Sequence, residues 1–161
     1  VLMPQYGVET VTVASTDLDE WERALSKPTK AVFLETPSNP MMQILDIEAI
    51  AELAHKAGAR LIVDNVFATP IYQHPLQLGA DIVLLDGTFW SADELPRQDA
   101  VPHPPVAETL ERLGARREGD PRVVFIHLNH TNPLCNPDSD ESAQLARAGW
   151  ETGHEGLAFR I

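Results

Sequence analysis

The sequence predicts an α/β fold: a mostly parallel sheet with helices on both faces in the N-terminal half, followed by a smaller α/β segment. Short runs of consecutive apolar residues, at 31–34, 61–63 and 82–85, are typical of buried parallel strands. Stretches with helical spacing of apolar residues separate these runs, which favours strand–helix–strand units. Polar residues follow directly after the strands, where ligands bind in α/β proteins.

Capping and stop signals define the helices of the first half. Asp17, with Glu20 three residues later, is a typical helix start. Asp46 caps a second helix, and Gly58 is its expected C-terminal stop. The expected elements are, in order, a strand at 8–13, a helix at 18–25, a strand at 31–34, a helix between Asp46 and Gly58, and strands at 61–63 and 82–85.

The composition changes after Trp90, and the elements of the second half are shorter. Residues 91–105 are polar and rich in proline, which predicts a loop. A helix that begins at Ser139 or Asp140 is expected to stop before Gly149. The expected elements are a helix at 106–113, a strand at 123–126, a helix at 141–148 and a strand at 157–161.

The length, net charge and cysteine content of the chain exclude several classes of function. The chain has 161 residues, 43% of them hydrophobic, which suits one globular domain. The net charge of -12 argues against nucleic acid or an anionic membrane as the main partner, because both require a basic surface. Cys135 is the single cysteine, so no intramolecular disulfide forms, and no segment has the length of a membrane span. We therefore expect a soluble cytoplasmic protein, and its start at Val1 indicates a fragment or a cleaved product.

Three segments of the first half resemble one family of enzymes. The motifs ETPSNP, DIEAIAELAHKAGARLIVDNVFATP and PLQLGADIV, within residues 1–85, resemble the Cys/Met-metabolism pyridoxal-phosphate enzymes, such as O-succinylhomoserine sulfhydrylase and cystathionine γ-synthase. The resemblance implies that Asp64 pairs with the pyridinium nitrogen of the cofactor and that Asn39 lies near its phenolic oxygen and the substrate. From the residue pattern alone, Asp64 could instead cap a helix or bind loop amides. The implied reaction is γ-replacement on an activated homoserine, with a small amino acid as substrate.

The sequence departs from this family at DGTFW. There the family has Ser-Ala-Thr-Lys-Tyr, in which the lysine forms the Schiff base and serine and threonine hold the phosphate. This chain keeps only Thr88; Phe89 stands at the lysine position and Asp86 would face the phosphate. The resemblance thus implies pyridoxal-phosphate binding that is weak or lost, and a chain that is inactive alone.

Residues 81–161 resemble a second family, the C-terminal part of pyrroloquinoline quinone synthesis protein B, which has a metallo-β-lactamase-like fold. The resemblance rests on DGTFW, HLNHTNP, PDSDESAQLARAGW and EGLAF. It implies that Asp86 and His103 lie close together as a catalytic acid and histidine, and that His127 faces a divalent metal, zinc or iron. The alternative is that His103 is a loop histidine and that His127 packs at a strand end. The histidine-rich metal motif of that fold is missing, so the ligand set would be partial.

Three functions therefore remain open. The chain is a fragment of a pyridoxal-phosphate transsulfuration enzyme, a metallo-β-lactamase-like protein related to quinone-cofactor synthesis, or an inactive fusion of the two. The corresponding domains would be residues 1–85, part of a pyridoxal-phosphate-enzyme large domain, and residues 86–161, part of a metallo-β-lactamase-like half. Because the first family builds its sites across subunits, a homodimer is a further expectation.

Overall fold

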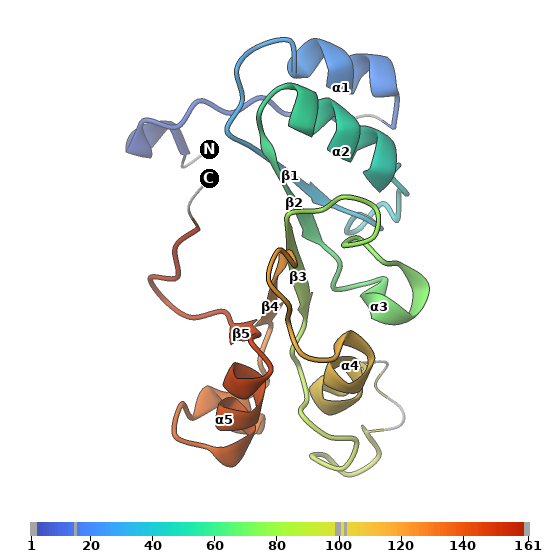
Figure 1. The fold of residues 1–161 in the computed structure, drawn as a ribbon. Helices are drawn as coiled ribbons and strands as arrows, with labels where there is room; N and C mark the ends of the chain where they lie inside the picture. Colours follow the sequence, from blue (N-terminus) through green and yellow to red (C-terminus); the bar gives the residue numbers. More distant parts are fainter. Residues whose placement is uncertain (1–2, 15, 99–100, 102, 160–161) are drawn as a thin grey trace.

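A computed structural model describes residues 3–14, 16–98, 101 and 103–159. Within this part of the chain, five strands form a single parallel sheet in the order β1-β2-β3-β4-β5 (Figure 1). The strands are β1 (Ala31–Glu35), β2 (Arg60–Asp64), β3 (Ile82–Asp86), β4 (Arg122–Ile126) and β5 (Glu151–Thr152). The helices are η1 (Met3–Tyr6), α1 (Leu18–Ala24), α2 (Ile47–Lys56), α3 (Thr69–Tyr72), α4 (Val106–Leu113), η3 (Pro133–Cys135) and α5 (Asp140–Arg147).

The predicted helix caps are confirmed. The Asp17 carboxylate accepts from the amide of Asp19, and the Asp46 carboxylate accepts from the amide of Ala49. Ser139 rather than Asp140 caps α5, since the Ser139 hydroxyl accepts from the Ser142 amide. These short side-chain-to-backbone bonds satisfy amides that have no partner inside the helix, so they determine where the helices begin.

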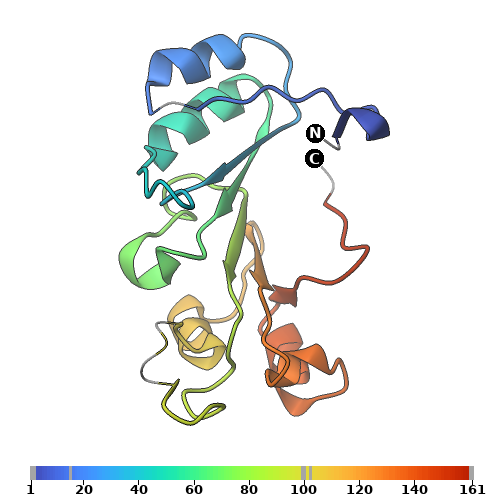
Figure 2. The same cartoon turned by 180° about the vertical axis from the view of Figure 1, so that it is seen from behind.

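The helices cover one face of the sheet and not both. In Figures 1 and 2, α2, α3 and α4 lie on the same side of the strands. On β1, Val32 and Leu34 face these helices and are 6% and 3% exposed, whereas Phe33 on the opposite face is 60% exposed. The strands are added in sequence order, so every right-handed crossover places its helix on the same face. The predicted cover on both faces is wrong for this reason.

On the opposite face of the sheet, Arg122 at the start of β4 binds β5 and the C-terminal tail. The Arg122 guanidinium binds both carboxylate oxygens of Glu151, at 2.5 and 2.6 Å, and lies 4.6 Å from the centre of the Phe159 ring. It also donates to the carbonyl of Ala158 at 3.1 Å. These contacts fix the two-residue strand β5 and hold the C-terminal tail against the sheet.

Other element predictions at the two ends of the chain differ from the structure. Residues 8–13 are not a strand: Val8 and Val11 are 47% and 63% exposed, and no described strand pairs with them. The strand expected at 157–161 is irregular at 157–159, and residues 160–161 lie outside the described part. The short elements α3 and β5 were not predicted, because one helical turn and a Glu-Thr pair have no apolar periodicity. None of the helices in the described residues has the length and apolar character of a membrane span.

Asp81 joins β2, β3 and α2 at the amino end of the sheet. Its carboxylate accepts from the Leu61 amide at 2.8 Å, from His55 Nε2 at 2.9 Å and from an Arg60 guanidinium nitrogen at 2.6 Å. Burial opposes ionisation of Asp81, but the Leu61 amide, His55 and Arg60 outweigh it, so the pKa lies below its ordinary value of 3.8. The ionised carboxylate therefore stabilises the fold.

We expect Asp81→Asn to lower the free energy of unfolding by about 1–2 kcal/mol at neutral pH, because it removes the charge from three hydrogen bonds. The Asp81 contribution is fully present above the ordinary value of 3.8 and is lost as the pH falls through the lower pKa of the folded state. Urea unfolding at neutral pH and at about pH 3 measures both effects, and the difference between the two proteins should shrink in acid. The exposed Asp138→Asn is the control; an equal loss in both variants would contradict the assignment.

Candidate functional site

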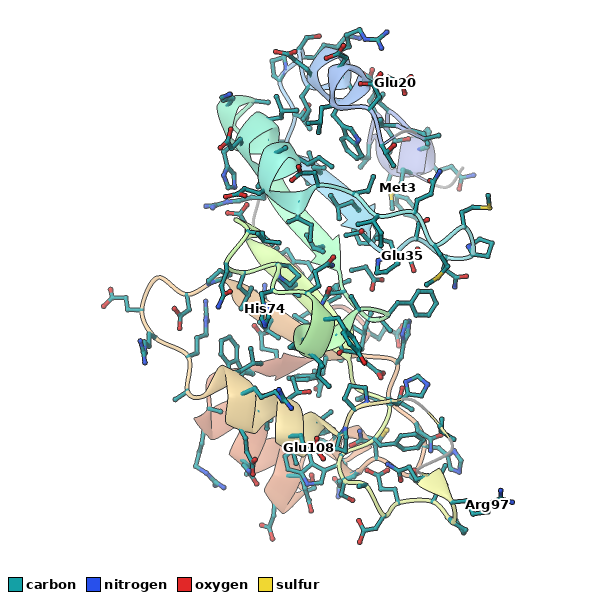
Figure 3. All side chains as sticks on the ribbon, turned by 90° about the vertical axis from the view of Figure 1, so that its right-hand side faces the viewer. Met3, Glu20, Glu35, His74, Arg97 and Glu108 are labelled. Carbon is teal, nitrogen blue, oxygen red and sulfur yellow. The ribbon has the colours of Figure 1, made fainter. Side chains whose placement is uncertain are left out.

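Three carboxylates lie at the carboxyl edge of the sheet. Glu35 ends β1, Asp64 ends β2 and Asp86 ends β3. The register pairs Glu35 with Asp64 directly, and it pairs Asp86 with Ile126, the residue before His127. Figure 3 shows Glu35 at the end of β1, away from the helices of the second half. The edge therefore divides into an acidic part around Asp64 and a separate part around Asp86.

Asp64 occupies the acidic part of this edge. Its carboxylate is half-buried and accepts from the Val66 amide at 3.1 Å. Burial raises the pKa of Asp64, the Val66 amide lowers it, the Glu35 carboxylate raises it and His127 lowers it, with a net increase. The carboxylate would therefore be stabilised by a cation or by a positively polarised N–H group placed against it.

Asn39 lies beside this acidic pair. Its backbone amide donates to Glu35 Oε2 at 3.0 Å, and its side chain is exposed. The preceding residue, Ser38, holds the loop closed, since its carbonyl accepts from the Met42 amide at 2.7 Å and its hydroxyl accepts from the Gln43 amide at 3.1 Å. The structure thus brings Asn39 to the same part of the edge as Asp64, through Glu35. The sequence motif contains Glu35, but its contact with both positions was not predicted.

Asp86 and His103 are in direct contact. His103 Nδ1 donates to Asp86 Oδ2 at 2.6 Å, and the Asp86 side chain is 2% exposed while that of His103 is 37% exposed. The second oxygen of Asp86 accepts from the Thr88 hydroxyl at 2.6 Å and from the Thr88 amide at 3.1 Å. His103 lies in a loop, as the alternative had it, and Asp86 holds its ring in place. A neutral His103 that donates through Nδ1 has its Nε2 available as a proton acceptor.

Phe89 is buried beside the Asp86–His103 pair. Its side chain is 3% exposed, and its ring meets the His103 ring edge to face with 6.0 Å between centroids. Its backbone carbonyl accepts from the Val106 amide, the first residue of α4. Position 89 is thus a packed hydrophobic position and presents no amine to the edge of the sheet.

His127 lies at the same edge of the sheet, one residue after Ile126, the register partner of Asp86. It directly follows β4, is exposed and has a left-handed backbone conformation with φ of 58°. The electrostatic interaction of His127 with Asp64 lowers the pKa of that carboxyl group. His130, three residues further on, contacts the side chain of Asn129. Among the described residues, no group of three or more His, Cys, Asp or Glu side chains is arranged to hold a metal ion.

A buried amide network was not predicted from the sequence. Asn65 and Thr36 are both 0% exposed, and Gln73 Nε2 donates to Asn65 Oδ1 at 2.7 Å and to the Thr36 carbonyl at 2.8 Å. The Thr36 hydroxyl in turn accepts from the Leu45 amide at 2.9 Å. This network fixes the loops that follow β1 and β2, which carry Asn39 and flank Asp64.

Comparison with known proteins identifies the first half. The family model for Cys/Met metabolism PLP-dependent enzymes matches residues 1–91. The chain belongs to this family. O-succinylhomoserine sulfhydrylase of Mycobacterium tuberculosis (strain ATCC 25618 / H37Rv) is 58% identical over 87 residues, which are 54% of this chain and 21% of that protein. Cystathionine gamma-lyase of Bacillus subtilis (strain 168) is 46% identical over 87 residues, 54% of this chain and 23% of that protein.

The solved structures agree with the sequence relatives. The crystal structure of an apo methionine gamma lyase from Micromonospora echinospora superposes with a TM-score of 0.50 at 36% identity and covers 53% of this chain and 24% of that one. The present chain spans about a fifth of the length of the curated relatives, 21% for the sulfhydrylase and 23% for the lyase. The parallel α/β fold of the first half is confirmed.

The family's cofactor fits one end of the site and not the other. Asp64 and Glu35 form an acidic edge, and no lysine or arginine of the described residues binds either carboxylate, which suits a protonated pyridine nitrogen. At the other end, both hydrogen-bond donors of Thr88 bind Asp86, and the buried Phe89 stands where the family resemblance predicts a Schiff-base lysine. A phosphate there would meet the Asp86 carboxylate. The residues present thus fit the ring of pyridoxal phosphate but not its phosphate group or a covalent link at position 89.

Proposed function

We propose that this family member retains the ring-nitrogen half of a pyridoxal-phosphate site from a transsulfuration-type enzyme of sulfur amino-acid metabolism, and that it is inactive alone. The observation that carries the proposal is the Asp64 carboxylate, whose pKa is raised by burial and by Glu35 at the open carboxyl edge of the sheet. An acidic group in this state gains most from a ligand that brings an N–H cation to it.

Asp64 would hold a proton on the pyridine nitrogen of the cofactor. When bound, pyridoxal phosphate supplies an electron sink for a carbanion next to the substrate amino group. Asn39 would place a polar side chain on the same ligand, and its amide contact with Glu35 supports this role. The substrate class that this half of the site serves in the parent enzyme is a small activated amino acid, and the parent reaction is γ-replacement by a sulfur nucleophile.

The chain would not perform this reaction by itself for two physical reasons. Phe89 has no amine for covalent attachment of the cofactor, and its side chain is packed in the interior. Asp86 places a negative charge where the phosphate group would lie, and Thr88 already donates to that carboxylate. Any binding is therefore noncovalent and weak. We also propose that a partner, such as a second copy of the chain in a homodimer, would be needed to complete the site.

The test uses pyridoxine phosphate, which has the ring and the phosphate of the cofactor but no aldehyde, so surface lysines cannot react with it. Calorimetric titration should show weak binding, and Asp64→Asn should weaken it about 10- to 100-fold, the range for loss of a charge-assisted hydrogen bond. The variant Asp93→Asn, an exposed aspartate in the loop after β3, should bind as the original chain does. Equal affinity in both variants would sink the proposal, as would γ-replacement turnover by the chain with pyridoxal phosphate.

Asp86 and His103 support a second candidate function, proton transfer. The observation in its favour is the 2.6 Å contact between a buried carboxylate and a partly exposed imidazole, which fixes the orientation of the ring. Their catalytic role stays a proposal. The metal at His127 receives no support from the described residues, because no ligand group surrounds that histidine. The fusion of two fragments also stays a hypothesis, and unfolding experiments can test it.

A further inference from the structure

The helix-covered side of the sheet contains a cavity that the pyridoxal-phosphate site does not use. It has a volume of about 590 Å³ and lies between the loop after α3, the end of α4 and the sheet. Its floor is apolar and consists of Val83, Leu85 and Val123, and Trp150 forms part of the wall. His74, which also lines the cavity, lies above α4 on the side that faces the viewer in Figure 3. The cavity is therefore large enough for a small ring compound.

A buried donor without a partner lines this cavity. Asn65 is 0% exposed, and its Nδ2 has no acceptor among the described protein atoms. The orientation of this amide is fixed, because Oδ1 accepts from Gln73 Nε2 at 2.7 Å and the reverse orientation would oppose two NH₂ groups. A buried donor without an acceptor is unfavourable, so a ligand oxygen that reaches Nδ2 would be strongly preferred.

The rim of the cavity is cationic in a chain whose net charge is -12. Arg112 and Arg117 line it, and neither guanidinium is paired with a carboxylate among the described residues. The one lining carboxylate, Asp120, already accepts from the Arg117 backbone amide at 2.6 Å. Two unpaired guanidinium groups beside an apolar floor favour a ligand with an anionic end.

We propose that this cavity is a binding site for a small aromatic or branched carboxylate that also carries a carbonyl oxygen. The apolar part lies on Val83, Leu85 and Val123, the carbonyl oxygen accepts from Asn65 Nδ2, and the carboxylate faces Arg112 and Arg117. A ligand in this cavity would not contact Asp64, because neighbouring residues of an extended segment point to opposite faces of the sheet.

The test compares three probes that differ by one group. The first, 4-acetylbenzoate, has the ring, the carbonyl and the carboxylate; benzoate lacks the carbonyl, and acetophenone lacks the carboxylate. Binding is measured by calorimetry and by shifts of the Asn65 side-chain amide and the Trp150 indole in NMR spectra. We expect 4-acetylbenzoate to bind about five- to tenfold more tightly than either of the other two, the gain of one hydrogen bond or one charge contact.

Variants locate the two polar contacts. Asn65→Asp keeps the acceptor for Gln73 and removes the donor, so it should abolish the preference for 4-acetylbenzoate over benzoate. Arg112 is exposed, so Arg112→Gln should leave folding unaffected and lower the affinity for 4-acetylbenzoate and for benzoate about fivefold. Arg147→Gln, an exposed change on α5, should leave both affinities unchanged. If 4-acetylbenzoate does not saturate the chain, or if its affinity equals that of benzoate in the unchanged protein, the proposal is wrong. Unchanged affinity in Arg112→Gln and Arg117→Gln would also overturn it.

Discussion

Phe89→Ala is expected to lower the free energy of unfolding by about 3–5 kcal/mol, the usual cost of removing a buried phenyl ring. The Phe89 side chain is 3% exposed and packs against the His103 ring, so its removal leaves a cavity beside the Asp86–His103 pair. Urea unfolding followed by circular dichroism measures the change. Phe67→Ala is the matched control, because Phe67 is 48% exposed; its loss should stay below about 1 kcal/mol. Similar losses in the two variants would contradict the buried position of Phe89.

The packing of Phe89 also affects the predicted absence of a Schiff-base lysine at position 89. Phe89→Lys should destabilise the chain at least as much as Phe89→Ala, because it places an ammonium group in an apolar position. We therefore expect this single change not to restore transsulfuration activity. The predicted departure from the family at position 89 is coupled to the packing of Phe89 against His103 and to its backbone hydrogen bond with Val106.

Gly87→Ala is expected to destabilise the chain by about 1–3 kcal/mol, the cost of overpacking a well-packed site. A Cβ atom at Gly87 would lie 2.8 Å from the carbonyl oxygen of Ile126 and 2.9 Å from Leu128 Cδ2. That carbonyl also accepts from the Gly87 amide at 2.7 Å, so it cannot move without losing a hydrogen bond between β3 and β4. Thermal melting of the variant should occur at a lower temperature. Glu111→Ala, on the exposed side of α4, should melt as the unchanged protein does.

The unchanged protein should melt in one cooperative transition. The strand β3 pairs with β2 of the first half and with β4 of the second, so neither half completes its core alone. Trp21 and Trp150 both belong to the common core, one in each half. Coincident transitions by circular dichroism and tryptophan fluorescence would show one folding unit. Two separate transitions would favour independent units at residues 1–85 and 86–161.

The candidate site was partly predictable. Through the family resemblance, the motif after β2 predicted Asp64 and the motif after β1 predicted Asn39, and their binding roles stay predictions. The contact of Glu35 with both positions depends on the pairing of β1 with β2, which no local pattern encodes. The Asp86–His103 contact joins residues 17 positions apart across a proline-rich loop, and it came from a resemblance and not from spacing. The Asn65–Gln73 network and the cavity beside it have no sequence signal, because they depend on how α3 packs on the sheet.

By itself, the sequence determined the elements whose physical cause is local. Asp17, Asp46 and Ser139 begin helices because each side chain binds an amide two or three residues away. Apolar runs gave β1 to β4 because a strand buried in a parallel sheet needs them. The tertiary structure alone decided that residues 8–13 have no strand partner, that the Arg122–Glu151 pair holds β5, and that all crossovers place their helices on one face. These outcomes depend on backbone and side-chain partners far apart in the chain, and hydrogen bonds between them form only when the sheet assembles.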